Sequence, residues 1–299
     1  MQKKITRLEH PRNAHMVGDG FRVSQYIPGY GRDMTPDTSP FLMLDYNAPW
    51  TIPPQKKGYR PGVGFHPHRG FETVTIVYSG EVEHQDTAGN GGIIWSDEVQ
   101  WMTAGSGLLH NEFMSERFSH AGGVQHAVQL WVDLPKDMKM TSPRYQALTR
   151  ENIPEVLFEW GKVRVIAGNL KAKDGQGKEM RENGVAETFS PIELYDIRFQ
   201  STGKIDLEFP DGWNLMILVT EWETEIDGKP LSNGDMAYFS LDGNRVSINT
   251  SSLAKILVMA GKPLWQNVIN YWPFVMTTEA EIVEAWQDFQ AGKMGKIDF

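Results

Sequence analysis

The sequence predicts an all-β protein made of two sandwich- or barrel-like domains, and three observations lead to this fold class. Gly (29 residues) and Pro (17 residues) are spread over the whole chain. The segments between them are short and alternate apolar with polar residues, as strands do, and segments with helical spacing are rare. The 299 residues correspond to about two domains at roughly 150 residues each.

Seven segments have the clearest strand pattern because β-branched and other apolar residues recur in them with strand-like spacing. They are Phe71 to Tyr78, Val124 to Val132, Val163 to Ala167, Ile205 to Phe209, Asn214 to Thr220, Arg245 to Asn249 and Lys255 to Met259. Asp227-Gly228, Asn233-Gly234 and Asp242-Gly243 predict tight hairpins, since these residues tolerate a positive φ. The polar stretch from Lys171 to Asn183 predicts a solvated surface loop.

Residues 135–150 begin with a polar stretch that contains Pro135 and Pro143, near the middle of the chain. This composition favours a linker between an N-terminal domain of residues 1–134 and a C-terminal domain of residues 151–299. Near the C-terminal end, residues 278–281 form a capping-box pattern, and apolar residues at helical spacing follow as far as Gly292. We therefore expect one short C-terminal helix that packs its apolar face on a barrel.

The composition excludes several classes of function. Lys and Arg number 29 against 38 Asp and Glu, which gives a formal charge of −9 and argues against direct binding of nucleic acid. We find neither the apolar stretch of a secretory signal nor the roughly 20 apolar residues of a membrane span, so we expect a cytoplasmic protein that does not bind membranes. Because the chain has no Cys, any metal ion must be held by His, Asp or Glu.

The candidate metal ligands form two pairs that share one spacing. His66 and His68 are two residues apart, and so are His110 and Glu112. In a strand such pairs point to one face, so the four side chains converge if the two strands are neighbours. Three imidazoles and one carboxylate suit a divalent transition metal, and two of six octahedral positions stay open for chemistry. One His-x-His pair can arise by chance, and the second pair strengthens the prediction.

The distribution of histidine points to the same region. All eight His residues lie at or before His126, so the second half of the chain cannot form a His-rich metal site. We expect the unpaired residues to be structural or exposed; they are His10, His15, His84, His120 and His126. Glu72 matches the parity of His66 and His68, but Gly70 can reset the alternation, so two orientations stay open for its side chain.

These segments resemble the two metal-binding motifs of the cupin superfamily. Within this superfamily, the segments from His66 to Val74 and from Gln100 to His110 are most similar to the pirin family. Further segments over nearly the whole chain resemble pirins as well: Phe41 to Asp45, Leu130 to Pro135, Pro143 to Gln146 and Pro273 to Met276.

The resemblance implies a bicupin, in which two jelly-roll β-barrels face each other and only the N-terminal barrel holds a metal ion. The pirin ligands correspond by motif to His66, His68, His110 and Glu112. Glu72 has the position of a general cupin ligand but is not a ligand in pirins, which leaves it as an outer partner of the site. The expected metal is Fe(II), with Mn, Co, Ni, Cu and Zn as alternatives because all accept imidazole and carboxylate ligands.

Some pirins resemble quercetin 2,3-dioxygenases, which open the central ring of a flavonol with O₂ and release carbon monoxide. The resemblance implies this activity here, with Glu112 as the base that takes the flavonol proton. No substrate-binding residue is assigned from the sequence. Four apolar residues near the motifs are candidates for the walls of the site, although we expect each of them to pack in the core: Phe41, Met43, Trp101 and Met102.

Two alternatives remain open at this stage. Other pirins resemble metal- and redox-sensing regulators that bind a protein partner, either a transcription factor or an enzyme. A third interpretation is a cupin isomerase or another oxygenase that acts on a different enol-type substrate. We expect a monomer, because the two barrels can cover each other's faces.

Overall fold

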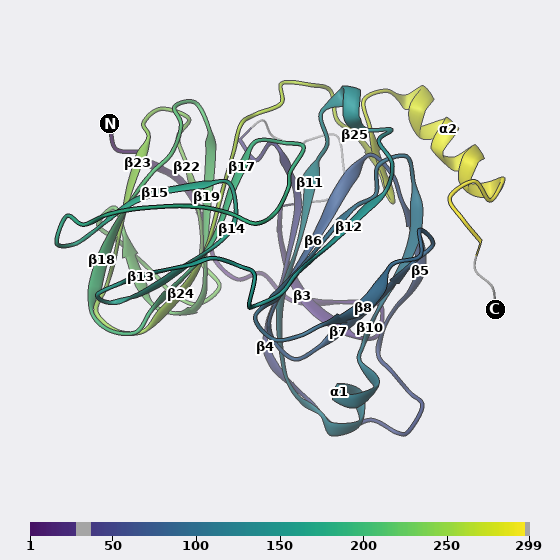
Figure 1. The fold of residues 1–299 in the computed structure, drawn as a ribbon, viewed down its shortest axis with the longest axis horizontal. Helices are drawn as coiled ribbons and strands as arrows, with labels where there is room; N and C mark the ends of the chain where they lie inside the picture. Colours follow the sequence, from purple (N-terminus) through teal and green to yellow (C-terminus); the bar gives the residue numbers. More distant parts are fainter. Residues whose placement is uncertain (28–36, 297–299) are drawn as a thin grey trace. The chain divides into compact units, whose positions relative to one another are not determined.

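The computed structural model describes residues 1–27 and 37–296, which form two compact units of antiparallel sheets (Figure 1). We call one the histidine unit; its described residues are 12–27, 41–150 and 265–296. The other, the aliphatic unit, contains residues 1–11, 37–40 and 151–264. Each end of the chain thus clusters with the unit formed by the opposite half, while the predicted domains 1–134 and 151–299 stay a prediction.

The histidine unit contains a seven-stranded sheet and a four-stranded sheet. The first has the order β12 (Arg144–Leu148), β9 (Glu98–Thr103), β6 (Phe71–Ser79), β11 (Gly123–Asp133), β4 (Phe41–Ile52), β3 (Phe21–Ile27) and β2 (His15–Val17). The second has the order β5 (Gly62–His68), β10 (Leu108–Met114), β7 (Val82–Asp86) and β8 (Gly91–Ile94). The remaining elements are α1 (Glu116–Ala121), the 3-10 helix η1 (Lys136–Met138), the pair β25 (Ile269–Tyr271) and β26 (Phe274–Met276), and α2 (Glu279–Gln290).

The aliphatic unit is built in the same way from a seven-stranded and a six-stranded sheet. The first has the order β1 (Ile5–Glu9), β22 (Met236–Phe239), β19 (Asn214–Trp222), β24 (Ala254–Gly261), β17 (Ile192–Phe199), β14 (Gly161–Ala167) and β13 (Glu155–Phe158). The second has the order β16 (Glu179–Asn183), β15 (Asn169–Asp174), β18 (Gly203–Glu208), β23 (Arg245–Thr250), β20 (Thr224–Ile226) and β21 (Lys229–Leu231).

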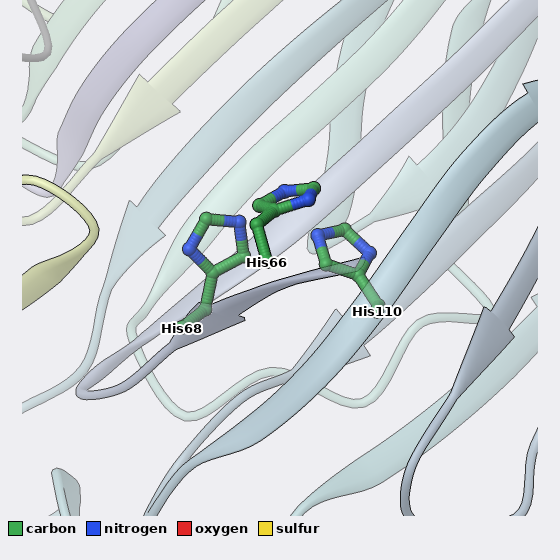
Figure 2. A group of neighbouring side chains, drawn as sticks. All are labelled: His66, His68 and His110. Atoms are coloured by element: carbon green, nitrogen blue, oxygen red, sulfur yellow. The ribbon is translucent and has the colours of Figure 1, made fainter. Parts of the chain in front are cut away.

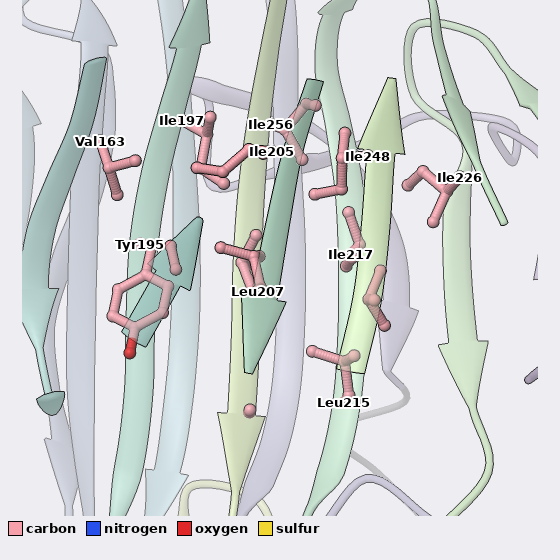
Figure 3. Packing of buried hydrophobic residues seen from close by; sticks show 14 of the residues in the cluster. Val163, Tyr195, Ile197, Ile205, Leu207, Leu215, Ile217, Ile226, Ile248 and Ile256 are labelled. Carbon is pink, nitrogen blue, oxygen red and sulfur yellow. The ribbon is translucent and has the colours of Figure 1, made fainter. Parts of the chain in front are cut away.

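Apolar side chains from both sheets fill the interior of the aliphatic unit. Val163, Ile197 and Ile217 extend from the seven-stranded sheet, and Ile205 and Ile248 from the six-stranded one (Figure 3). All five are fully buried. The period-2 pattern of the sequence therefore produces one continuous core, because inward-facing residues of two packed sheets interdigitate.

The sequence predicted the strands well and the turns less well. All seven predicted strands are present, with ends within two residues of those observed. Asp227-Gly228 forms the predicted hairpin between β20 and β21, with a positive φ at both residues. The hairpins predicted at Asn233-Gly234 and Asp242-Gly243 are wrong, because each turn connects strands of different sheets. A turn motif sets the local reversal, whereas the packing of two sheets decides which strand the chain joins next.

The surface loop predicted from Lys171 to Asn183 is also wrong. The segment lies in the hairpin of β15 and β16, and its alternate residues Ala172 and Met180 are buried in the core. Between them Lys173, Lys178 and Glu179 are exposed, while Asp174 is buried. A polar strand with small or flexible apolar residues at every second position was thus mistaken for a loop.

The predicted C-terminal helix is confirmed as α2. Thr278 caps its first turn and forms a full capping box with Glu281. Ile282 and Ala285 are buried in a cluster with Phe274 and Leu109 of the histidine unit. In the stretch predicted as a linker, residues 144–148 form β12, which pairs with β9.

Within the described part of the chain, no helix is long and apolar enough to cross a membrane.

Candidate metal centre

Two neighbouring antiparallel strands bring the predicted histidines together. Strand β5 carries His66 and His68, and strand β10 places His110 directly opposite His66. Pro67 lies between the first two, which is tolerated because β5 is the edge strand of its sheet and needs no second hydrogen-bonded neighbour there. Since alternate residues share a face, the three imidazoles lie on the same side of the four-stranded sheet.

The three rings form a compact group (Figure 2). One nitrogen from each of His66, His68 and His110 lies within 4.8 Å of the others. The ring centroids are 4.3 Å apart for His66 and His110, 4.7 Å for His66 and His68, and 4.9 Å for His68 and His110. A group of this size can hold one metal ion.

The hydrogen bonds of the rings leave the same nitrogen available in each. Nδ1 of His66 contacts the carbonyl oxygen of Gly64 at 2.9 Å, and Nδ1 of His68 contacts that of Pro273 at 3.2 Å. Nδ1 of His110 lies 3.4 Å from Nδ1 of His84, and its buried Nε2 has no hydrogen-bond partner among the described residues. Metal-binding histidines commonly use one nitrogen for the metal and donate from the other, so these residues fit a metal ion bound through Nε2.

Burial keeps these imidazoles in the neutral form that a metal ion requires. It holds the pKa values of His68 and His110 well below the ordinary value, and the neighbouring ring of His66 lowers them further. Burial also lowers the pKa of His66, although its contact with Gly64 and the charge of Glu112 oppose this. Uncharged rings near neutral pH do not have to lose a proton before they bind a cation.

His84 is a member of the site that the sequence analysis missed. It is buried on β7, next to β10, and its Nε2 lies 3.3 Å from Oδ2 of Asp86. If Nε2 of His110 faces a metal ion, its Nδ1 donates to Nδ1 of His84, and His84 donates from Nε2 to Asp86. Asn90 holds the Asp86 carboxylate in turn. His84 and Asp86 have the same two-residue spacing as the recognised pairs, and that signal could have revealed them.

Asp86 is well suited to end this chain of contacts as an anion. Burial alone would raise its pKa, but hydrogen bonds from His84 and Asn90 outweigh burial and lower it. The backbone N–H groups of Ala88 and Asn90 also donate to Oδ1 of Asp86. The carboxylate is thus fixed in place, and it favours the tautomer of His84 that accepts from His110.

Glu112 is close to the imidazole group but is not part of it. It is buried on β10, and its carboxylate accepts hydrogen bonds from the Gln129 amide at 2.9 and 3.0 Å and from the Thr75 hydroxyl at 3.2 Å. The pairing of β10 with β5 shifts by a residue between His110 and Glu112, which changes the spacing expected of a regular strand. Its role as fourth ligand and base stays a prediction.

Glu72 lies away from the imidazole group. Gly70, with a φ of +87°, connects β5 of one sheet to β6 of the other. Thr75 of β6 faces the cavity described below. Because Glu72 is an odd number of residues from Thr75, the Glu72 side chain points to the opposite face of β6. It is fully buried and accepts a hydrogen bond from the Thr103 hydroxyl at 2.7 Å.

The C-terminal segment supports the strand that carries His66 and His68. The buried Arg69, next to His68, donates to the Asp288 carboxylate of α2 at 2.9 Å and to the Ser106 carbonyl at 2.7 Å. A Cβ atom at Gly70 would lie only 2.0 Å from the carbonyl oxygen of Val275, so this close approach requires glycine. Residues 200 positions apart in sequence therefore fix one end of the site.

The imidazole group opens into a cavity of about 120 Å³ between the two sheets of the histidine unit. Its apolar wall includes Val23, Met43, Val128 and Trp131, and its polar residues include Glu112 near the histidines. Met43 is buried in a core cluster, as expected, and it also lines this cavity. Phe41, Trp101 and Met102 are completely buried, as expected.

Comparisons with known proteins agree with this fold. The Pirin family model matches residues 20–132, and the model described as the Pirin C-terminal cupin domain matches residues 194–295. A Pseudomonas aeruginosa protein named "Putative quercetin 2,3-dioxygenase" is 41% identical over 97% of this chain and 98% of its own length. A pirin-like protein from Solanum lycopersicum is 34% identical over 94% of this chain and 90% of its own.

Solved structures lead to the same class. A crystal structure of quercetin 2,3-dioxygenase from Acinetobacter baumannii is 40% identical and covers 100% of both chains, with a TM-score of 0.89. The fold is thus that of a protein with two cupin domains, which confirms the predicted class. The chain belongs to the pirin family, as its motifs indicated.

Proposed function

We propose that this chain is a pirin-like, metal-dependent dioxygenase that opens the ring of quercetin or a related flavonol with O₂ and releases carbon monoxide. The observation that carries the proposal is the group of His66, His68 and His110 at the wall of a largely apolar cavity. The names of the relatives at 40–41% identity support the same reaction. In the overall balance, flavonol and O₂ give a ring-opened ester and carbon monoxide.

The proposed ligands are the Nε2 atoms of the three histidines together with the carboxylate of Glu112. Fe(II) is the proposed ion, and Mn, Co, Ni, Cu and Zn suit the same donors. A divalent ion bound here supplies Lewis acidity, which lowers the pKa of a coordinated hydroxyl group, and a position for O₂ beside the substrate.

Glu112 is proposed to take the proton of the flavonol hydroxyl group. Its carboxylate lines the cavity, where a substrate can reach it. Gln129 and Thr75 donate to it and hold its orientation. A base fixed in this way needs no rearrangement when the substrate binds, which favours proton transfer.

The apolar walls are proposed to exclude water from the reacting ring. Met43 and Trp131 lie in the cavity with His68, and Trp131 packs edge-to-face against that imidazole, with centroids 5.2 Å apart. An aromatic substrate gains contact area on such walls, and a dry site strengthens the charge interactions at the metal.

The direct test is carbon monoxide release and loss of flavonol absorbance when iron-reconstituted protein meets quercetin in air. His110→Ala and a chelator-treated sample are run beside it, and both are expected to release no carbon monoxide. If the metal-loaded protein binds iron through these residues but releases none, the dioxygenase proposal fails for this substrate. The metal-sensing regulator that binds a protein partner then becomes the leading interpretation.

A further inference from the structure

A row of polar side chains crosses the floor of the cavity. Gln25, Asp45, Gln129 and Thr75 lie on four adjacent strands, β3, β4, β11 and β6, and each is directly opposite the next. All four line the cavity. We call them the polar row. Neighbouring strands are about 4.8 Å apart, so the row leads stepwise away from Glu112, the residue to which Gln129 and Thr75 donate.

Gln129 and Thr75 both form hydrogen bonds with Glu112. Asp45, in contrast, has a hydrogen-bond partner for only part of its carboxyl group. Gln25 donates to one part of its carboxyl group. Its other oxygen, Oδ1, is buried and has no hydrogen-bond partner in the described part of the chain. Asn47, two residues along β4, also lines the cavity, and its Oδ1 is likewise unpartnered within residues 1–27 and 37–296 while its amide donates to Arg22.

Buried acceptors without donors are costly, and a bound molecule can remove that cost by donating to them. Burial raises the pKa of Asp45 to about 6, although the Gln25 hydrogen bond and the charge of His15 oppose this. In its ionised form the carboxylate oxygen is the stronger kind of acceptor. The surroundings are apolar, with Val23 and Met43 on the same wall.

We propose that Asp45, with Asn47 beside it, forms a subsite that binds hydroxyl groups carried on the aromatic ring of the substrate. A ligand held at the histidines would extend over Gln129 to reach these acceptors. The subsite deepens the proposed function on which it rests, because it would make the site prefer polyhydroxylated flavonols. An apolar wall with a few acceptors selects flat aromatic molecules that carry O–H donors.

The test compares two probes that share the metal-chelating enol group. Quercetin carries additional ring hydroxyls, and 3-hydroxyflavone carries none. Binding to the metal-loaded protein is measured without O₂, by quenching of tryptophan fluorescence, so that turnover does not interfere. We expect the wild-type protein to bind quercetin at least about tenfold more tightly, as one hydrogen bond to a charged group would give.

Asp45→Leu is expected to remove most of this preference and to leave the affinity for 3-hydroxyflavone within about twofold. Asp45→Asn keeps an acceptor of the same shape and should retain part of the preference. Tyr46→Phe is the matched control, since Tyr46 is the next residue of β4 and is absent from the cavity lining. Metal content and thermal unfolding verify that each variant is folded.

The outcomes separate the subsite from the reaction. Equal losses for both probes in Asp45→Leu, or no loss for either, would overturn the subsite. Failure of the wild-type protein to bind either probe would overturn both proposals. A preference that depends on Asp45, without carbon monoxide release in air, would support the subsite and contradict the dioxygenase.

Discussion

The two units share one construction and differ in what their interiors contain. Each is a pair of packed antiparallel sheets, one of them seven-stranded. In the aliphatic unit, residues such as Ile217 and Ile256 fill the space between the sheets. In the histidine unit, imidazoles and the polar row face inward, and a cavity remains between the sheets.

This difference shows that the cupin fold alone does not create a site. A site forms only where inward-facing positions carry suitable residues. Strand alternation delivers inward-facing positions in both units. Where those positions carry Val, Ile and Leu, close packing stabilises the unit. Where they carry His, Asp, Gln and Glu, part of that packing is replaced by a cavity with polar groups in its lining. Function therefore depends on the residues at these positions and not on the fold itself.

Loss of one imidazole should remove most of the metal affinity that we expect of the histidine unit. His110→Ala is expected to lower metal affinity by more than the 10- to 100-fold that removal of an outer hydrogen-bond partner costs. Elemental analysis after dialysis against iron measures this. The control is His120→Ala, which removes an exposed histidine of α1 outside the group. Equal metal content in both variants would contradict the assigned site.

A cavity in the aliphatic unit should affect stability and not metal binding. Ile217→Ala is expected to lower the free energy of unfolding by about 2–5 kcal/mol, since Ile217 is completely buried in the core. Ile217→Val is the matched control, with a loss of about 0.5–1.5 kcal/mol. Denaturant unfolding and metal content are measured together. Loss of metal from folded Ile217→Ala would show that the aliphatic core controls the site.

The buried Glu72 should make stability depend on pH. Burial raises its pKa from 4.5 to about 7, against the opposing hydrogen bond from Thr103. The folded chain therefore keeps a proton that the unfolded chain releases, and the free energy of unfolding falls as pH rises through this range. Glu72→Gln mimics the protonated group and removes the loss.

We expect the stability of Glu72→Gln relative to wild type to rise by about 2 kcal/mol between about pH 5 and about pH 8. Urea unfolding at the two pH values measures this change. Glu116→Gln on α1 removes an exposed carboxylate and serves as the control. A pH-independent difference for Glu72→Gln would mean that Glu72 is ionised throughout.

The smallest expected effect concerns the outer partner of the metal site. His84→Leu removes the acceptor for Nδ1 of His110 and should weaken metal binding about tenfold. His84→Asn offers an oxygen near the same place and should restore part of the affinity. Competition with a chromogenic chelator measures both. Identical affinities for wild type and His84→Leu would show that Asp86 and His84 do not orient His110.

The sequence predicted most of the fold because strand alternation is a local property. The two-residue spacing of His66 and His68, and the same spacing of His110 and Glu112, predicted that these side chains converge. The three imidazoles do lie together, and their role as metal ligands stays a prediction. The turn at Asn233-Gly234 was misjudged because the choice between sheets is made by packing and not by local φ preferences.

What the sequence by itself determined is the face to which each side chain points, since that depends only on counting along a strand. The tertiary structure alone decided which strands are neighbours, and this register placed His84 beside His110 and Asp45 opposite Gln129. It also brought the Pro273 carbonyl to His68, 205 residues earlier in the chain. Contacts of this kind depend on long-range pairing and on burial, which no short stretch of residues encodes.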